Sequence, residues 1–192
     1  MNEKPDRFLF KPVTANNWPD LEALFGPRGA CAGCWCMYWR VPRKEFTKGQ
    51  GEPFRKALKS LVEGGTTPGL IAYEGGQPVG WISAGKREEF VLLAQSKVLA
   101  PVDDQHVWSI VCFFVARSHR KQGLMLPLIN AAVDYAASQG ARIVEGYPMD
   151  PYKRLGGVSA YVGITSEFVK AGFYDAARRS EHHPVMRRIV GG

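Results

Sequence analysis

The sequence of 192 residues lacks the long hydrophobic runs that membrane proteins carry. A helix that crosses a bilayer needs about 20 consecutive apolar residues, and no segment approaches that length. The segment Met1–Lys11 contains several charged residues, and Phe8-Leu9-Phe10 is far too short for the apolar core of a signal peptide. We therefore expect no membrane association and a cytoplasmic location.

Cysteine is also scarce, and its placement differs from that of a secreted disulfide framework. Of 4 cysteines, Cys31, Cys34 and Cys36 are crowded into one short segment. A Cys-x-x-Cys-x-Cys spacing is compatible with a zinc or iron–sulfur site or with a redox disulfide. A closed zinc site needs four ligands, however, and neither a second Cys-x-x-Cys nor a His pair of zinc-finger spacing is present. Reduced thiols and no metal are the simplest expectation.

The sequence contains no internal repeat, linker or low-complexity tract, which predicts one domain over residues 1–192. The formal net charge of +7 suits either a nucleic acid or a small polyanion. The basic residues come in short groups, and no nucleic-acid recognition motif is present. A small polyanion is therefore the better expectation, with no nucleic-acid partner.

Hydrophobic periodicity and turn signals predict alternating strands and helices. The segment 107–115, the helical segment 124–138 and the segment 141–147 form a β-α-β unit, whose strands should be parallel. A glycine turn at residues 74–77 joins an antiparallel hairpin. The remaining expected elements are strands at 8–13, 70–73, 78–84, 174–178 and 185–190, helices at 18–25, 53–62 and 165–171, and a loop at 26–43.

The most informative segment is Val115 to Met125, where a strand ends, a basic turn containing glycine follows, and a helix begins. Free N–H groups at a helix N-terminus and the positive end of the helix dipole point at the same place. Gly123 lets an anion approach the main chain closely, and Arg120 and Lys121 add charge beside it. The alternative is an ordinary connection with solvated side chains.

This segment resembles the acetyl-coenzyme A signature of the GNAT superfamily of N-acetyltransferases, with Arg120, Gln122 and Gly123 in register. The segment 169–173, a short helix ending in Gly-Phe, is similar to the family's closing motif. The resemblance extends from Phe8 to Val190. It implies an α/β (α+β) fold with a mostly antiparallel sheet of about six or seven strands, a central parallel β-α-β unit and flanking helices.

The resemblance also implies direct transfer of an acetyl group from acetyl-CoA to an amine, in a gap between the two parallel strands. The main chain of the first strand would pair with the pantetheine arm, and an N–H near Phe114 would polarise the thioester carbonyl. The residues implied for the cofactor are Phe113, Phe114, Val115, Arg117, Arg120, Lys121, Gln122, Gly123, Leu124 and Met125.

Two positions depart from the family pattern. Met125 stands where the family usually has Gly or Ala, which affects how closely the helix approaches the pyrophosphate. Phe168 stands where the family often has a tyrosine, so a common proton donor to the departing thiolate is missing.

The sequence leaves the proton chemistry open among several side chains. Glu145, in the second parallel strand, is the first candidate for the base that deprotonates the amine, and its alternative is a salt-bridged strand residue. Asp150 is a weaker second candidate. Tyr161 and Tyr174 are candidate acids, although water could serve, and Tyr147 could line the gap.

The aromatic residues of the cysteine-rich segment suggest acceptor recognition. In GNAT-like enzymes this loop commonly forms a wall of the acceptor pocket, and Trp35, Tyr38 and Trp39 offer flat surfaces that bind cations. The equal alternative is a core cluster that covers one end of the sheet. The expected acceptor is a small-molecule amine or an amino group of a peptide or protein, and a catalytically weak or inactive CoA-binding module is the alternative function. Homodimers formed through the C-terminal strands are common in the family.

Overall fold

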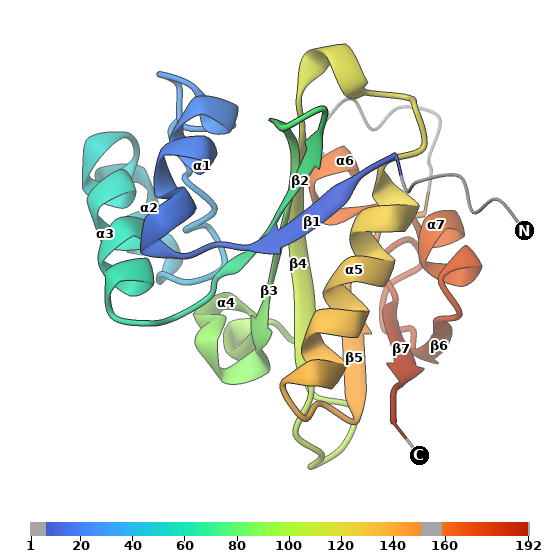
Figure 1. The fold of residues 1–192 in the computed structure, drawn as a ribbon. Helices are drawn as coiled ribbons and strands as arrows, with labels where there is room; N and C mark the ends of the chain where they lie inside the picture. The colour runs from blue at the N-terminus through green and yellow to red at the C-terminus, as the bar shows by residue number, and fades with distance from the viewer. Residues whose placement is uncertain (1–6, 151–158, 192) are drawn as a thin grey trace, which may run out of the picture.

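The computed structural model describes residues 7–150 and 159–191. Within these residues, seven strands form one sheet in the order β1-β2-β3-β4-β5-β7-β6 (Figure 1). Every neighbouring pair is antiparallel except β4 and β5. This arrangement confirms the predicted mixed sheet with a central parallel β-α-β unit. The strands are β1 (Leu9–Pro12), β2 (Gly69–Glu74), β3 (Gln77–Lys86), β4 (Trp108–Val115), β5 (Ile143–Gly146), β6 (Tyr174–Ala177) and β7 (Val185–Ile189).

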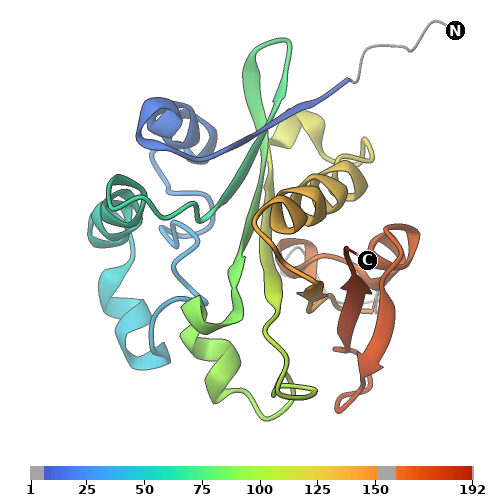
Figure 2. The ribbon, with the colours of Figure 1, turned by 60° about the horizontal axis from the view of Figure 1, so that its bottom comes forward.

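Helices cover both faces of the sheet. Helices α1 to α3 lie on one side, and α5 and α7 lie on the other (Figures 1 and 2). The helices are α1 (Trp18–Phe25), α2 (Arg43–Gly49), α3 (Glu52–Glu63), α4 (Val91–Gln95), α5 (Met125–Ser138), α6 (Ser159–Val162) and α7 (Thr165–Lys170). The sequence did not predict α2, α4 and α6, because helices this short carry too little apolar periodicity to be recognised. No helix among the described residues is long and apolar enough to cross a membrane.

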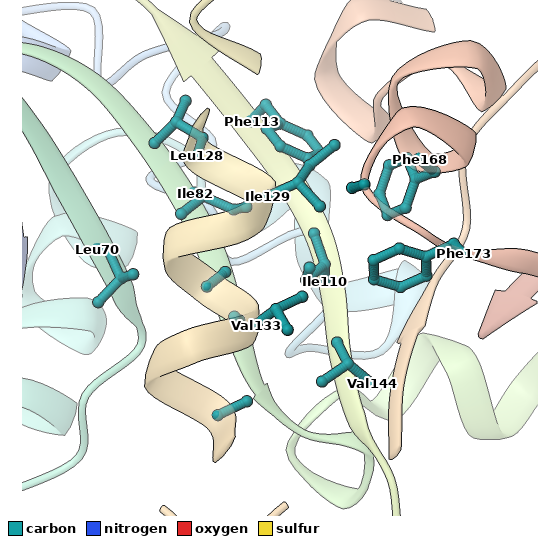
Figure 3. Close-up of a cluster of buried hydrophobic side chains, with 14 of the residues drawn as sticks. Leu70, Ile82, Ile110, Phe113, Leu128, Ile129, Val133, Val144, Phe168 and Phe173 are labelled. Carbon is teal, nitrogen blue, oxygen red and sulfur yellow. The ribbon is translucent and has the colours of Figure 1, made fainter. Parts of the chain in front are cut away.

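The core on the α5 side joins the parallel unit to the C-terminal helix. Leu128 and Ile129 of α5 pack onto the sheet beside Phe113, and Phe168 and Phe173 close the cluster from the other end (Figure 3). Leu128, Ile129 and Phe168 are completely buried. The contact between α5, α7 and β4 therefore fixes where the turn before α5 lies relative to the edge of β4.

The core on the opposite face is built around tryptophan side chains. Helix α3 contributes Phe54, Leu58 and Val62, whose spacing of four residues places them on one helix face. These side chains pack in one cluster with Trp81 of β3 and Trp35 of the 26–42 segment. The segment that precedes α2 is thus an integral part of the core.

Candidate active site

The turn between β4 and α5 leaves a row of main-chain N–H groups without partners. Lys121 and Gly123 have positive φ angles of 61° and 76°, a conformation typical of concave anion-binding nests. Within the described chain, the N–H groups of residues 122–126 have no hydrogen-bond partner. A Cβ placed on Gly123 would meet no atom within 4 Å, so the surface above the turn is open. The turn can therefore bind an anion through its main chain and the dipole of α5.

The side chains of the turn hold it in place and leave its positive charge exposed. Arg120 Nε donates to the Val115 carbonyl at 3.1 Å. Gln122 Nε2 donates to the Ser118 carbonyl at 2.7 Å. The side chains of Arg117, Arg120 and Lys121 lie on the surface. The turn is thus a folded cradle with positive charge around it.

The residue that departs from the family pattern does not enter this cradle. The Met125 side chain packs against the core cluster under α5, next to the buried Leu124. The Met125 side chain is half-buried in this contact. Because this side chain packs against the core, the row of N–H groups stays accessible.

Strand β4 diverges from its parallel neighbour. Strand β5 pairs with β4 only from Trp108 to Ile110, whereas β4 continues to Val115. The pairing with β3 skips Val111, which is the mark of a β-bulge. A bulge bends a strand and ends regular pairing. Among the described residues, β4 beyond Ile110 therefore has no paired strand on its β5 side, and we call this open edge the gap between the parallel strands.

The ladder determines which main-chain groups face this gap. Ala116 N–H donates to the Val79 carbonyl of the neighbouring strand β3 at 2.9 Å. Because antiparallel pairing alternates, Phe114 also directs its N–H to β3, and Phe113 and Val115 direct theirs to the gap. Any N–H that polarises a carbonyl in the gap then belongs to Phe113 or Val115.

Phe168 fills the space beside the gap and makes two glycines necessary. Its ring is 6.1 Å from the Phe113 ring, centroid to centroid. A Cβ on Gly146 would lie 2.0 Å from the Phe168 ring, and one on Gly163 would lie 2.8 Å from it. Phe168 is completely buried and has no proton to donate. It acts as packing between β5 and the C-terminal helices.

Glu145 lies in a buried network of charged and polar groups. Its carboxylate accepts hydrogen bonds from Arg187 Nε at 2.8 Å, Arg87 Nη1 at 2.9 Å and the Tyr147 hydroxyl at 2.7 Å. The Glu145 side chain is 1% exposed. Such a carboxylate is neutralised and shielded, so this placement favours the salt-bridged alternative over the role of a base.

The network extends through side chains that no sequence motif marks. Arg187 makes a two-point contact with Asp103, at 2.6 and 2.8 Å, and this contact holds the pKa of Asp103 well below its usual range. Tyr147 is 1% exposed, and its burial raises the pKa of its hydroxyl. Tyr147 therefore packs inside the network and offers little surface to a substrate. No sequence signal indicates Arg187. Its position opposite Glu145 follows only from the order of the strands in the sheet.

The two tyrosines proposed as acids lie in different places. Tyr161 belongs to α6, and this helix lies beside β4 (Figure 1). It forms a hydrogen bond with Cys31, which raises the pKa of the Tyr161 hydroxyl to about 12. Tyr174 lies on the edge strand β6 and is 49% exposed. Because β5 and β7 separate β6 from β4, Tyr174 is distant from the gap. Asp150 is paired with Arg178 at 2.7 Å.

The three aromatic residues that were expected to bind the acceptor differ in their burial. Trp35 is 5% exposed and stacks on Trp18 with 6.1 Å between the ring centroids, so it lies in the core. Tyr38 and Trp39 are half-buried and contact each other edge to face at 5.2 Å. Trp39 also packs against the cluster that contains Tyr147. Of the three, Tyr38 and Trp39 retain surface that a ligand could touch.

The four cysteines are all free thiols. Among the described residues, no group of three or more His, Cys, Asp or Glu side chains is arranged to hold a metal ion.

The comparisons with known proteins agree with this geometry. The family model described as Acetyltransferase (GNAT) family matches residues 34–148. A search of curated protein sequences found no relative. Among solved structures, arylalkylamine N-acetyltransferase 2 from Aedes aegypti is 14% identical with a TM-score of 0.59, and the match covers 97% of this chain and 100% of that chain.

Two structures of similar fold contain the coenzyme or its acetyl form. PaiA N-acetyltransferase from Thermoplasma acidophilum in complex with coenzyme A is 11% identical, with a TM-score of 0.54 and coverage of 95% and 99% of the two chains. NAA60 from Arabidopsis thaliana in complex with acetyl-CoA is 18% identical, with a TM-score of 0.51 and coverage of 95% and 99%. At these identities the likeness concerns the fold. The family model covers more than half of the chain, and the protein therefore belongs to the GNAT family of acetyltransferases.

Proposed function

We propose that the protein transfers an acetyl group from acetyl-CoA to an amine. The observation that carries this proposal is the row of unpaired N–H groups at residues 122–126, next to the unpaired edge of β4. In acetyl-CoA a pyrophosphate joins the adenosine part to the pantetheine arm, and the thioester lies at the far end of that arm. The amide groups of the arm can pair with a strand edge. The cradle and the edge are adjacent in the chain and match these two parts in order.

The chain's own groups have distinct roles in this proposal. The N–H groups of residues 122–126 bind the pyrophosphate, with Arg117, Arg120 and Lys121 adding charge. The main chain of Phe113 and Val115 holds the arm as an added strand would be held. The Phe113 N–H donates to the thioester carbonyl, whose oxygen gains negative charge during transfer. Acetyl-CoA supplies the activated acetyl group.

For the proton chemistry, we assign Tyr161 as the donor to the departing thiolate. Tyr161 lies in the helix beside β4, and its raised pKa keeps the hydroxyl protonated at neutral pH. Phe168 cannot take this role. We assign Glu145 to positioning, because Arg87, Arg187 and Tyr147 hold its carboxylate. The network then fixes β5 relative to β4 at the place where they diverge. The amine is deprotonated by another group or by water.

The alternative function is a CoA-binding module with weak or no catalysis. Two observations favour it: Phe168 replaces the usual acid, and the Glu145 carboxylate of β5 is shielded. Binding would be the same in both cases, so only turnover separates them.

The test is calorimetric titration with acetyl-CoA and CoA, followed by turnover with a panel of amines, with CoA release measured by chromatography. Micromolar binding together with acetylation of an amine supports the enzyme. Binding without turnover across arylalkylamines, polyamines and peptide N-termini supports the binding module. Absence of binding contradicts both functions.

A further inference from the structure

Three thiols form a continuous row from the 26–42 segment to strand β4. Cys36 Sγ lies 3.8 Å from Cys112 Sγ and donates to it. On its other side, the Cys36 thiol forms a hydrogen bond with Cys34. Trp81 Nε1 donates to Cys36 Sγ at 3.0 Å, which fixes the central sulfur in the core. The proposed acetyl transfer uses none of these three groups.

Cys34 lies in a tight turn of the main chain, next to the Cys36 thiol. Gly33, Trp35 and Cys36 have positive φ angles of 73°, 43° and 53°. They form a tight turn in which the N–H groups of Gly33, Cys34 and Trp35 donate to main-chain carbonyls. The hydrogen bond from the Cys36 thiol, followed by main-chain hydrogen bonds of the same segment, lowers the pKa of Cys34 to about 6. A half-buried thiolate with hydrogen-bond donors is the form of cysteine that reacts with oxidants.

The other two thiols have complementary properties. Contact with Cys112 and burial raise the pKa of Cys36 well above its usual value, so Cys36 remains a thiol. Cys36 is 4% exposed and therefore less accessible to a dissolved oxidant than Cys34. A disulfide has its sulfur atoms about 2.05 Å apart. Cys36 and Cys112 would have to approach by only roughly 1.8 Å to form one.

We propose that these thiols form an oxidation site for hydroperoxides, in which Cys34 reacts first and the product is a disulfide between Cys36 and Cys112. The Cys34 thiolate attacks one oxygen of hydrogen peroxide, the O–O bond breaks, and Cys34 sulfenic acid and hydroxide form. The Cys36 thiol then condenses with the sulfenic acid, giving a Cys34–Cys36 disulfide and water. Finally, the Cys112 thiolate attacks the Cys36 sulfur, and Cys34 leaves as a thiolate. The sum is two thiols and one peroxide converted to one disulfide and two waters.

The product would join two parts of the proposed active site. Cys112 directly precedes Phe113, whose N–H faces the gap, and Cys36 lies in the segment that carries Tyr38 and Trp39. A covalent bond between them would tie the aromatic segment to the strand that holds the arm of the cofactor. The site itself needs no cofactor, so its test is independent of the proposed function.

Peptide mapping tests the proposal directly. The protein is treated with equimolar hydrogen peroxide, the remaining thiols are blocked with N-ethylmaleimide, and the sample is digested with trypsin without reduction. Cleavage after Arg28, Arg40, Lys97 and Arg117 gives one peptide, 29–40, with Cys31, Cys34 and Cys36, and another, 98–117, with Cys112. We expect mass spectrometry to find these two peptides joined by a disulfide, released by dithiothreitol. A disulfide confined to peptide 29–40, or over-oxidised Cys34 without a cross-link, would overturn the proposal.

Variants test the assigned order. Cys34→Ser should slow cross-linking about tenfold or more, because the reactive thiolate is gone, while the end product can still form. Cys112→Ser should remove the cross-link and leave the Cys34–Cys36 disulfide. Cys31→Ser is the matched control within the same segment and should cross-link at the wild-type rate. If Cys34→Ser is folded by circular dichroism and cross-links at the wild-type rate, the role of Cys34 is contradicted. Peptide mapping of the wild-type protein tests the Cys36–Cys112 disulfide even if Cys112→Ser does not fold.

Discussion

Glu145 and Arg187 form an ion pair inside the sheet, with Arg187 Nε 2.8 Å from Glu145 Oε1 and the two side chains 1% and 6% exposed. The two residues lie opposite each other on β5 and β7. Removing one partner of such a pair leaves a buried charge without compensation, whereas an exposed pair contributes little. The pair therefore joins the parallel unit to the C-terminal hairpin at an energetically sensitive point.

The first prediction concerns this pair. Arg187→Met should lower the free energy of unfolding by about 3–5 kcal/mol, because Glu145 loses one of its two cations in a buried site. Arg55→Met is the control: Arg55 pairs with Glu22 and Glu52 on the surface, and its loss should cost about 1 kcal/mol or less. Urea denaturation measures both. Equal effects of the two substitutions would show that the Glu145 network contributes no special stability.

The second prediction concerns the cradle. Gly123→Glu adds negative charge and a side chain to the row of N–H groups, and it should raise the Kd for CoA about a hundredfold or more by calorimetry, a loss of about 2.7 kcal/mol. Gly140→Glu is a matched control, because Gly140 also has positive φ, 85°, and open space around its Cβ position, but it lies beyond the other end of α5. Both variants carry the same backbone strain and the same charge. Comparable loss of binding in both would mean that the cradle does not hold the cofactor.

The third prediction concerns pH. Burial lowers the pKa of His183, whose Nε2 lies 2.9 Å from the Tyr147 carbonyl. The folded protein then binds this proton less readily than the unfolded chain, whose histidine has a pKa of about 6.5. Stability should therefore fall as the pH decreases from about 7 to 5. His183→Gln should remove part of this slope in thermal melts, whereas His106→Gln, at a side chain that is 98% exposed, should not. An unchanged slope in His183→Gln would assign the pH dependence to other groups.

The sequence predicted strand β4 and helix α5, with a glycine turn between them, because each depends on a local pattern. The alternation in residues 107–115, the basic glycine turn and the apolar periodicity of 124–138 are each contained in a short segment. The structure has β4 at Trp108–Val115 and α5 at Met125–Ser138, within one residue of the expected positions. Local propensity and tertiary structure agree at these places.

The interior of the candidate site could not be predicted because it depends on contacts distant in sequence. Whether Glu145 is a base or a salt-bridged residue is decided by Arg87, which directly follows β3, and by Arg187 of β7. Whether Trp35 touches a ligand or the core is decided by its stacking on Trp18. The row of thiols similarly needs Cys112, which lies 76 residues from Cys36. Sequence spacing indicates none of these partners.

The last prediction concerns the proton donor. Tyr161→Phe should lower kcat about 10- to 100-fold, because the departing thiolate loses its donor, while the Kd for acetyl-CoA stays within about twofold, since the cradle and the edge of β4 are unchanged. The hydrogen bond with Cys31 raises the pKa of Tyr161 to about 12, so the wild-type rate should show no loss of this acid below about pH 10. Tyr174→Phe is the matched control, an equal loss of one hydroxyl at an exposed position on the edge strand, and it should leave kcat unchanged. If Tyr161→Phe retains the full kcat over this range, water protonates the thiolate. In that case Tyr161 serves only to pack α6 against the cysteine segment.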